Sequence, residues 1–282
     1  MEESIRKADI LVEALPYIQA FRGKVMVAKY GGSAIDNPAA MRGILQDMVF
    51  LSAVGIHSVL VHGGGPMITR KLSAAGKKSA FVKGMRVTDG ETIRVVNEEL
   101  EAVNCRLVEQ IQALGGQAEG IVPARRVIVA QPHPLASQLG FVGCVKAVET
   151  VSLREVFSRQ MIPVISPVGV NDGQLYNINA DDVAAEVAAQ LSAEKLVLLT
   201  NVRGILRQAS DETSLISTLS VEEARMLLER GVIQEGMIPK VKACIEALLR
   251  GVRKTHVIDA AIPHAMLLEI FTKQGIGTEI MK

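Results

Sequence analysis

The sequence lacks a strong excess of charge, a long apolar run and clustered cysteines. Its 31 Lys and Arg residues nearly balance its 30 Asp and Glu residues, so no overall field attracts a nucleic acid or an anionic membrane. No apolar run approaches the roughly 20 residues that span a bilayer. Cys105, Cys144 and Cys244 are odd in number and widely spaced, which argues against a disulfide framework or a CxxC metal site. These features favour a protein of the reducing cytoplasm that binds neither nucleic acid nor membrane.

The N-terminal segment has the features of a helix rather than of a targeting signal. It starts acidic and carries charges every few residues, which excludes a signal or transit peptide pattern. Its apolar residues follow helical spacing: Ile5, Ala8, Leu11, Val12 and Leu15. We expect a helix in front of the first strand, packed either on its own domain or on another subunit.

Beyond this helix, short β-branched runs alternate with longer amphipathic segments. Near-continuous apolar strands that alternate with helices predict a mostly parallel sheet covered by helices on both faces. The runs RRVIVA (125–130) and FVGCVKAV (141–148) alternate strictly with no helix expected between them, which predicts a hairpin. Helices are expected from Asn37-Pro38 onward and over 66–75, 89–115, 152–159, 180–191, 220–231, 238–250 and 263–271.

Two glycine clusters follow the first two predicted strands, as KYGGS (29–33) and HGGGP (62–66). Ligands of parallel sheets bind at the carboxyl ends of strands, where both clusters lie. Neither GxxxxGK[ST] nor GxGxxG occurs at these places, so the common nucleotide fingerprints do not explain them. Exposed backbone N–H groups at a helix start suit an anion, and a tight structural turn is the alternative.

The HGGG sequence also occurs in esterases, where it forms an oxyanion hole. An esterase of that kind needs a nucleophilic serine within GxSxG. No serine of this chain has glycine both two residues before it and two residues after it. The sequence therefore argues against an acyl hydrolase.

Two lysines occupy positions that a core or a helix does not favour. Lys29 ends a strand that is otherwise apolar, and Lys240 lies in the first turn of a helix that begins near Pro239, where a cation opposes the helix dipole. Each alone is more simply a solvated side chain. Together they would offset the charge on a transferring phosphoryl group.

A third polar segment is YNINADDVAAEVAA (176–189). Asp181 and Asp182 lie in the first turn of the predicted helix, where the dipole favours acids. The dipole does not account for the amides of Asn177 and Asn179, which precede that turn in an extended run. An amide there could hold a carboxylate, and Asp181 could hold the two lysines in position.

Eight segments in this order resemble the amino-acid kinase family, and within it the acetylglutamate kinases: KYGGS, VHGGGP, GMRVTD, SPVGV, YNINAD, LLTNVRGIL, EGMIPK and HAMLLEIFTKQGIGT. The resemblance implies an α/β fold, an open three-layer αβα sandwich around a mostly parallel central sheet. It also implies an N-terminal oligomerisation helix over 1–23, an acetylglutamate-binding lobe over 24–175 and a nucleotide-binding lobe over 176–282.

The resemblance further implies ATP-dependent phosphorylation of the γ-carboxylate of N-acetyl-L-glutamate in arginine biosynthesis. Lys29 and Lys240 would contact the phosphoryl group, and Asp181 would orient both. Mg²⁺ would be carried by ATP, without metal ligands from the protein. A carboxylate needs no general base, so His62 and His264 are interpreted as structural. Phosphate and acceptor would be held by Gly31, Gly32, Gly64, Gly65, Arg86, Asn177 and Asn179, and the nucleotide would lie near Thr200, Asn201, Gly204 and Met237. For Arg86, a surface loop arginine is the alternative.

The N-terminal helix and residues 264–278 resemble the arginine-inhibited branch, which implies a homohexamer, a trimer of dimers, with arginine as inhibitor. The matching arginine positions are Tyr17, Lys195, Glu269, Gly275 and Gly277. A solvated surface pair is the alternative for Lys195 and Glu269. Asn201 departs from the family's usual Asp, and Ala260 and Ala261 from a usual glycine pair. Two rival functions are an acetylaminoadipate kinase and a catalytically weak amino-acid sensor.

Overall fold

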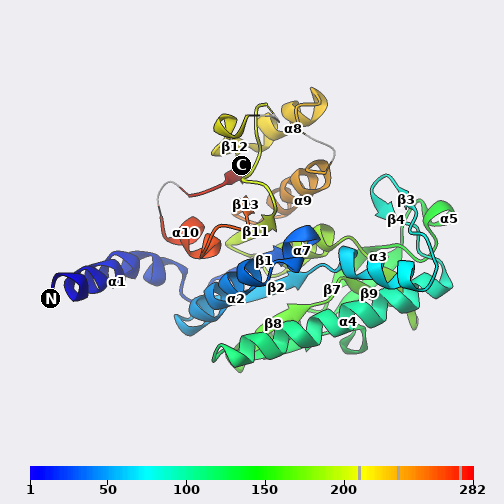
Figure 1. The fold of residues 1–282 in the computed structure, drawn as a ribbon, viewed down its shortest axis with the longest axis horizontal. Helices are drawn as coiled ribbons and strands as arrows, with labels where there is room; N and C mark the ends of the chain where they lie inside the picture. The colour runs from blue at the N-terminus through cyan, green and yellow to red at the C-terminus, as the bar shows by residue number, and fades with distance from the viewer. Residues whose placement is uncertain (209–210, 234–235, 273–274) are drawn as a thin grey trace.

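The computed structural model describes residues 1–208, 211–233, 236–272 and 275–282. Its centre is an eight-stranded sheet in the order β12-β14-β13-β11-β1-β2-β8-β5 (Figure 1). Neighbouring strands run parallel except β13 and β14, which are antiparallel. The strands are β1 (Val25–Tyr30), β2 (His57–His62), β5 (Ala118–Ile121), β8 (Ile162–Ile165), β11 (Lys195–Thr200), β12 (Thr218–Ser220), β13 (Lys254–Asp259) and β14 (Thr278–Met281). The predicted α/β sandwich with a mostly parallel sheet is confirmed.

Helices cover both faces of this sheet, and several begin at the predicted caps. The Asn37 side chain accepts hydrogen bonds from the N–H groups of Ala39 and Ala40, both at 3.1 Å. Ser220 and Glu223 form the reciprocal capping box. The helices are α1 (Glu2–Phe21), α2 (Pro38–Ala53), α3 (Gly65–Ala74), α4 (Gly90–Ala113), α5 (Ala136–Leu139), α6 (Thr150–Ser158), α7 (Ala180–Gln190), α8 (Val221–Glu229), α9 (Ile238–Leu249) and α10 (Ala265–Phe271).

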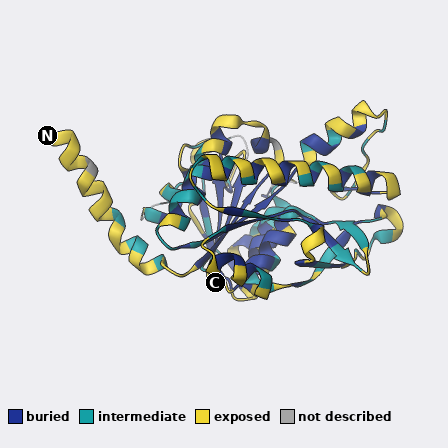
Figure 2. Ribbon diagram, turned by 90° about the horizontal axis from the view of Figure 1, so that it is seen from below, coloured by how far each residue is buried: buried dark blue, intermediate teal, exposed yellow. Residues whose placement is uncertain are grey.

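The side chains of β1 alternate between two apolar cores on opposite faces of the sheet. Val25 and Val27 pack into the core that includes residues of α6, α7 and α9. Met26 and Ala28 pack into the core that includes residues of α2, α4 and α10. Figure 2 shows the buried strands between these layers. Because alternation in a strand has a period of two, Lys29 faces the α7 side with Val27.

A smaller sheet flanks the main one, in the order β10-β9-β6-β7. The predicted hairpin is confirmed as the antiparallel pair β6 (Ile128–Pro132) and β7 (Gly143–Val148). The expectation that no helix separates them is wrong, because the short α5 lies between. Its Leu139 is fully buried, so the connection folds back onto the protein.

Two further hairpins were not predicted. One is β3 (Phe81–Val82) with β4 (Met85–Arg86), and the other is β9 (Val168–Asn171) with β10 (Gln174–Asn177). Both residues of the β9–β10 turn, Asp172 and Gly173, have positive φ angles of 48° and 82°. The dipeptide Asp-Gly is a known signal for such turns, so the sequence did contain this hairpin.

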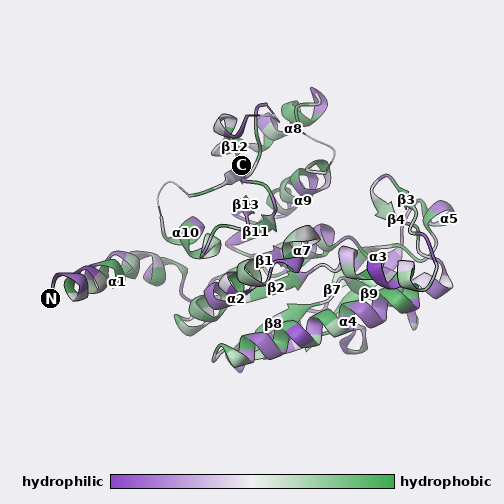
Figure 3. Ribbon diagram, in the orientation of Figure 1, coloured by the Kyte–Doolittle hydropathy of each residue, from purple (hydrophilic) through white to green (hydrophobic). Residues whose placement is uncertain are grey.

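Helix α1 projects away from the rest of the molecule (Figures 1 and 2). Several apolar side chains along it are exposed, including Leu11 at 66% and Val12 at 68%. Figure 3 shows apolar and polar residues mixed along its length. Near its C-terminal end, the Tyr17 ring meets the edge of Phe271 with centroids 6.0 Å apart. Among the described residues, the aromatic contacts of α1 with the domain therefore lie at this end. Across the described ranges, no helix has both the length and the apolarity that a membrane span needs.

Candidate active site

The register of β1 and β2 brings the two glycine clusters together. Tyr30 pairs with His62, so the residues that follow each strand also meet. The Gly63 N–H donates to the Tyr30 carbonyl at 2.8 Å. A Cβ on Gly31 would lie 3.0 Å from the Gly63 Cα, which leaves little room for a side chain. Glycine at this point therefore allows two loops from neighbouring strands to touch.

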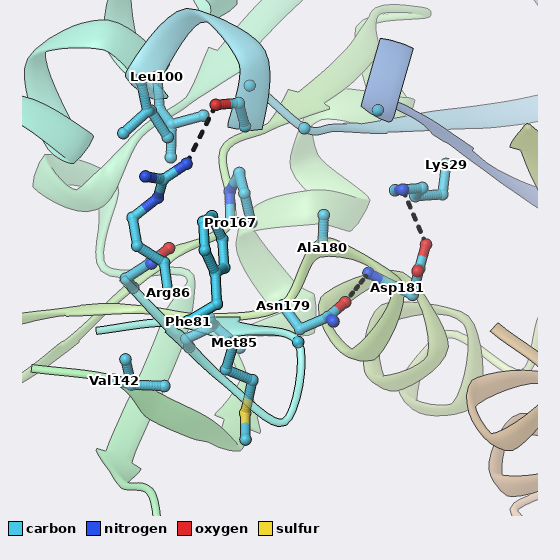
Figure 4. A pocket seen from close by; sticks show the side chains of 18 residues that line it. Lys29, Phe81, Met85, Arg86, Leu100, Val142, Pro167, Asn179, Ala180 and Asp181 are labelled. Atoms are coloured by element: carbon cyan, nitrogen blue, oxygen red, sulfur yellow. Dashed lines mark hydrogen bonds and ion pairs between the residues drawn. The ribbon is translucent and has the colours of Figure 1, made fainter. Parts of the chain in front are cut away.

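The N-terminus of α7 carries the carboxylate that joins the two lysines. The Asn179 side-chain oxygen accepts a hydrogen bond from the Asp181 N–H at 2.8 Å and so caps the helix. Asp181 Oδ1 lies 2.8 Å from Lys29 Nζ, and its Oδ2 lies 3.1 Å from Lys240 Nζ. Figure 4 shows Lys29 and Asp181 facing each other at the cavity. Lysines far apart in the sequence thus converge on one carboxylate, as the sequence predicted.

Asp181 and Lys29 are buried and Lys240 is half-buried, and this trio carries an excess of positive charge. Asp181 is 3% exposed and Lys29 is 6% exposed. Burial raises the pKa of Asp181, but the charges of Lys29 and Lys240 lower it more, so the net pKa lies below its ordinary value. Two ammonium groups and one carboxylate leave one net positive charge. That charge suits an anionic ligand. The neighbouring Asp182 is exposed and is not part of this trio.

A cavity of about 320 Å³ opens beside the trio (Figure 4). It extends from Lys29 and the glycine loops to the β3–β4 hairpin. Most of the predicted phosphate and acceptor residues line it: Gly32, Gly64, Gly65, Arg86, Asn177 and Asn179. Gly63 also lines it, although the prediction omitted this residue. As the first glycine of the same HGGGP cluster, Gly63 carried a visible signal.

Arg86 lies at the far side of the cavity from Lys29 and is held in place by neutral groups. Its guanidinium donates to the Gly65 carbonyl at 3.1 Å, to Thr69 Oγ1 at 2.8 Å and to Ser79 Oγ. It also stacks over the Phe81 ring at 4.8 Å. Among the described residues, no acidic side chain pairs with it. The side chain is only 8% exposed, so the alternative of a surface loop arginine is wrong.

The two predicted amides, Asn177 and Asn179, differ in which hydrogen-bonding groups of their side chains a ligand could use. Asn177 Nδ2 donates to Thr88 Oγ1 at 3.3 Å, a long bond that a ligand can replace. Asn179 uses its side-chain oxygen as the cap of α7, so only its NH₂ group remains for a ligand. Asn179 therefore has a structural function that the sequence analysis did not assign to it.

The predicted nucleotide residues line two smaller hollows rather than the cavity beside Lys29. Gly204 and Met237 border one of about 90 Å³, and Thr200 and Asn201 border another of about 190 Å³. The Thr200 hydroxyl donates to the Val202 carbonyl at 2.8 Å and accepts from the Val202 N–H, so it stabilises a turn. Glu235 of the EGMIPK motif lies outside the described residues.

Two of the residues predicted to bind arginine, Lys195 and Glu269, belong to a buried polar cluster at the amino end of β11. Lys195 Nζ lies 3.2 Å from His256 Nε2, and His256 Nδ1 lies 2.6 Å from Glu269 Oε1. Lys195 and Glu269 are each 6% exposed, so the alternative of a solvated surface pair is wrong. Burial lowers the pKa of His256 and outweighs the opposite effect of Glu269. The sequence analysis missed His256, whose position inside β13 resembles that of a core residue.

The glycines of this region have tight surroundings. The Ile276 N–H donates to Glu269 Oε2 at 2.7 Å, and a Cβ on Gly275 would lie 2.9 Å from the Glu269 carboxylate. A Cβ on Gly277 would overlap the Val257 carbonyl oxygen. Residues 273 and 274 of the HAMLLEIFTKQGIGT motif lie outside the described residues.

Within the described ranges, no three His, Cys, Asp or Glu side chains gather as metal ligands. Carriage of Mg²⁺ by ATP stays a prediction.

Together, the open α/β sandwich and two lysines joined through a carboxylate beside bare glycine loops define a phosphotransferase-like protein. Residues 24–259 match the model of the amino acid kinase family. The chain belongs to the amino acid kinase family, as its motifs indicated, and is a kinase.

Relatives narrow this class. An acetylglutamate kinase of Heliobacterium modesticaldum is 46% identical over 295 residues, which cover 100% of both chains. Among solved structures, N-acetylglutamate synthase from Neisseria gonorrhoeae, complexed with coenzyme A and N-acetyl-glutamate, has 28% identity and a TM-score of 0.86; the match covers 96% of this chain and 62% of that one. Carbamate kinase from Giardia lamblia bound to AMP-PNP has the same fold, at 16% identity and a TM-score of 0.68, over 92% of this chain and 99% of that one.

Proposed function

We propose that the protein transfers the γ-phosphoryl group of ATP to the γ-carboxylate of N-acetyl-L-glutamate, which gives N-acetylglutamyl 5-phosphate for arginine biosynthesis. The observation that carries the proposal is the convergence of Lys29 and Lys240 on buried Asp181 beside the cavity. The choice of acceptor is supported by the name of the relative at 46% identity.

In the proposed reaction, an oxygen of the acceptor carboxylate attacks the γ-phosphorus in line with the leaving group. The bond between that phosphorus and the β–γ bridging oxygen breaks, and ADP leaves with the electron pair. The carboxylate is nucleophilic at neutral pH, so no side chain has to remove a proton. Mg²⁺ on the ATP oxygens would supply further positive charge.

The lysines would act by position and charge. Charge spreads over the phosphoryl oxygens in the transition state, and preorganised donors near those oxygens stabilise it. Asp181 would hold both ammonium groups at 2.8 and 3.1 Å in the free enzyme, so that they need little reorganisation. The glycine loops would add backbone N–H groups without side chains to block the approach.

Arg86 would bind the second carboxylate of the acceptor, because a buried guanidinium without an acidic partner favours an anion. Replacing Arg86 by Gln should raise the KM for N-acetylglutamate about 10- to 100-fold, the value of a charge-assisted hydrogen bond, with a smaller change in the KM for ATP. Steady-state kinetics measure both constants. Arg94→Gln, at an exposed position of α4, is the control. Equal KM values for the two variants would exclude this contact.

The rival functions are separated by trapping the acyl phosphate with hydroxylamine. Acetylglutamate should give the hydroxamate with a higher kcat/KM than acetylaminoadipate, which is longer by one methylene, a difference of about 1–3 kcal/mol. Preference for the longer acid would make the chain an acetylaminoadipate kinase. A protein that gives no hydroxamate but binds arginine would be a sensor.

We also propose inhibition by arginine at the Lys195–His256–Glu269 cluster. Its buried carboxylate suits a guanidinium, since a carboxylate accepts two parallel N–H bonds. Glu269→Gln should raise the arginine concentration for half-inhibition at least about 10-fold, because it removes the charge that would pair with arginine. Arginine titration of the activity measures this, with Glu222→Gln on the exposed side of α8 as control. An unchanged inhibition curve would place arginine elsewhere.

The exposed apolar residues of α1 support a homohexamer, a trimer of dimers in which helices of neighbouring dimers pair. Sedimentation of the protein with and without residues 1–21 tests it: the shortened chain should have the mass of a dimer. A full-length dimer would rule the hexamer out.

A further inference from the structure

A buried histidine lies directly beneath the second glycine loop, and the proposed chemistry does not use it. His62 is the last residue of β2 and is 0% exposed. Its Nδ1 lies 3.0 Å from the carbonyl oxygen of Gly63. Its Nε2 lies 3.1 Å from Nδ2 of Asn104, a residue of α4 that is 1% exposed. The ring thus joins the helix on one face of the sheet to the backbone of the loop.

The hydrogen bonds of Asn104 determine which nitrogen of His62 carries the proton. Asn104 Nδ2 also donates to the Val164 carbonyl at 2.8 Å, and a carbonyl can only accept. Both hydrogens of this NH₂ group are therefore used, and His62 Nε2 must accept one of them. Burial lowers the pKa of His62 to about 4, so the ring is neutral at pH 7 and its one hydrogen is on Nδ1. That hydrogen is donated to the Gly63 carbonyl.

The surroundings leave space for this arrangement of the Asn104 amide. Gly120 of β5 pairs with Val164 of β8, next to the side chain of Asn104. A Cβ at Gly120 would overlap Asn104 Oδ1. The amide is therefore enclosed between α4 and two strands, and it has one orientation that satisfies its neighbours.

The hydrogen bond from His62 affects the cavity through the peptide bond between Gly63 and Gly64. Gly63 is held on both sides, since its N–H donates to the Tyr30 carbonyl at 2.8 Å and its carbonyl accepts from His62. In a planar trans peptide the C=O and the N–H point in opposite directions. The N–H of Gly64 therefore points away from the buried ring. Gly64 lines the cavity beside Lys29, and the described part of the chain offers no acceptor for its N–H.

We propose that Asn104 and His62 are positioning residues that aim the Gly64 N–H at an anionic oxygen in the cavity. The inference rests on the proposed function, because it takes that oxygen to belong to the phosphoryl group or the reacting carboxylate. Neither side chain touches the reacting atoms, and no proton is transferred. A donor held in advance stabilises developing charge without reorganisation, so its direction affects kcat.

Two substitutions of His62 separate positioning from simple packing. In His62→Asn the amide nitrogen replaces Nδ1, the donor to Gly63, whereas in His62→Gln it replaces Nε2. We expect kcat of His62→Gln to be at least about 10-fold lower than kcat of His62→Asn, with similar KM values. Asn fills the buried site less well than Gln, so a packing role predicts the reverse order. Equal kcat values, or kcat values that follow the thermal unfolding midpoints, would overturn the proposal.

The hydrogen bonds are tested without turnover by ¹⁵N NMR of histidine-labelled protein. The spectrum of the wild type should contain a ring with hydrogen on Nδ1 and none on Nε2 between pH 5 and pH 8 whose signal vanishes in His62→Asn. His256, whose Nδ1 faces Glu269 and whose Nε2 faces Lys195, should give a similar signal that remains in this variant. Hydrogen on Nε2 of His62 would overturn the proposal. If the wild type forms no acyl phosphate from acetylglutamate, the proposed function fails. In that case, binding tests the positioning by Asn104 and His62. We expect His62→Gln to bind MgADP with aluminium fluoride at least about 10-fold more weakly than His62→Asn, and equal binding would overturn the positioning proposal.

Discussion

Replacing Asp181 by Asn should lower kcat by about 10³-fold or more in a protein that still folds. The amide has nearly the same shape as the carboxylate but no charge. Lys29 Nζ and Lys240 Nζ, now at 2.8 and 3.1 Å from the two oxygens of Asp181, would then repel each other without a shared counter-charge. One preorganised donor contributes about 10² to 10³ in kcat, and this change displaces two.

The matched control is Asp182→Asn in the same first turn of α7, where the side chain is exposed. Its kcat should fall far less than that of Asp181→Asn, because Lys29 and Lys240 pair with Asp181 and not with Asp182. Hydroxamate formation at saturating substrates measures both variants. Equal losses for the two would mean that the helix terminus, rather than the contact with the lysines, governs activity.

Replacing Asp181 by Asn should also change how the free energy of unfolding depends on pH. The pKa of Asp181 is lowered in the folded protein, since the lysine charges outweigh burial. Its ionised form therefore contributes stability above about pH 4, the ordinary value, and this contribution is lost as pH falls through the lowered pKa. Urea unfolding of wild type and Asp181→Asn should give a difference in unfolding free energy that narrows below about pH 4. A difference independent of pH would contradict the ionised pair.

Replacing Lys240 by Ala should lower kcat about 10²- to 10³-fold and leave the fold intact. Lys240 lies in the first turn of α9 and its side chain is 21% exposed. A cation there opposes the helix dipole, so its loss does not weaken the helix, and Asp181 keeps Lys29 as its counter-charge. The loss of a charge aimed at the phosphoryl group should appear in kcat more than in KM, because the charge it stabilises develops in the transition state.

Lys242→Ala is the control for Lys240, since it removes an exposed lysine from the same helix. Its kinetic constants should equal those of the wild type. Single-turnover experiments with ATP separate the chemical step from product release in both variants. An unchanged kcat for Lys240→Ala would remove Lys240 from the catalytic set and leave its pair with Asp181 as a structural contact.

The parts of the fold that local signals encode were predicted well. Asn37 with Pro38, and Ser220 with Glu223, are caps whose hydrogen bonds depend only on neighbouring residues. Apolar runs marked most strands of the central sheet in the same way, whereas the short β12 was not predicted. The β9–β10 hairpin was also encoded locally, by Asp172 and Gly173, but the sequence analysis assigned no turn to this stretch.

The site was only partly predictable. Gly31, Gly64 and Lys29 attract attention because bare backbone and charge are unusual at the end of an apolar strand. His62 and Asn104 do not, since one histidine in a strand and one asparagine in a helix resemble ordinary buried or surface residues. Their importance follows from a contact across 42 residues of sequence, which no local pattern encodes.

By itself, the sequence determined the types and order of most of the strands and helices that form the central sheet and its covering layers, and the kinds of group available for chemistry, because these depend on residue type and short-range spacing. Only the tertiary structure decided which groups meet. The parallel register of β1 with β2 brings Gly31 against Gly63, and the packing of α9 beside α7 brings Lys240 to Asp181. Such contacts arise from the burial of apolar faces on the two sides of the sheet, which acts between segments that are distant in the chain.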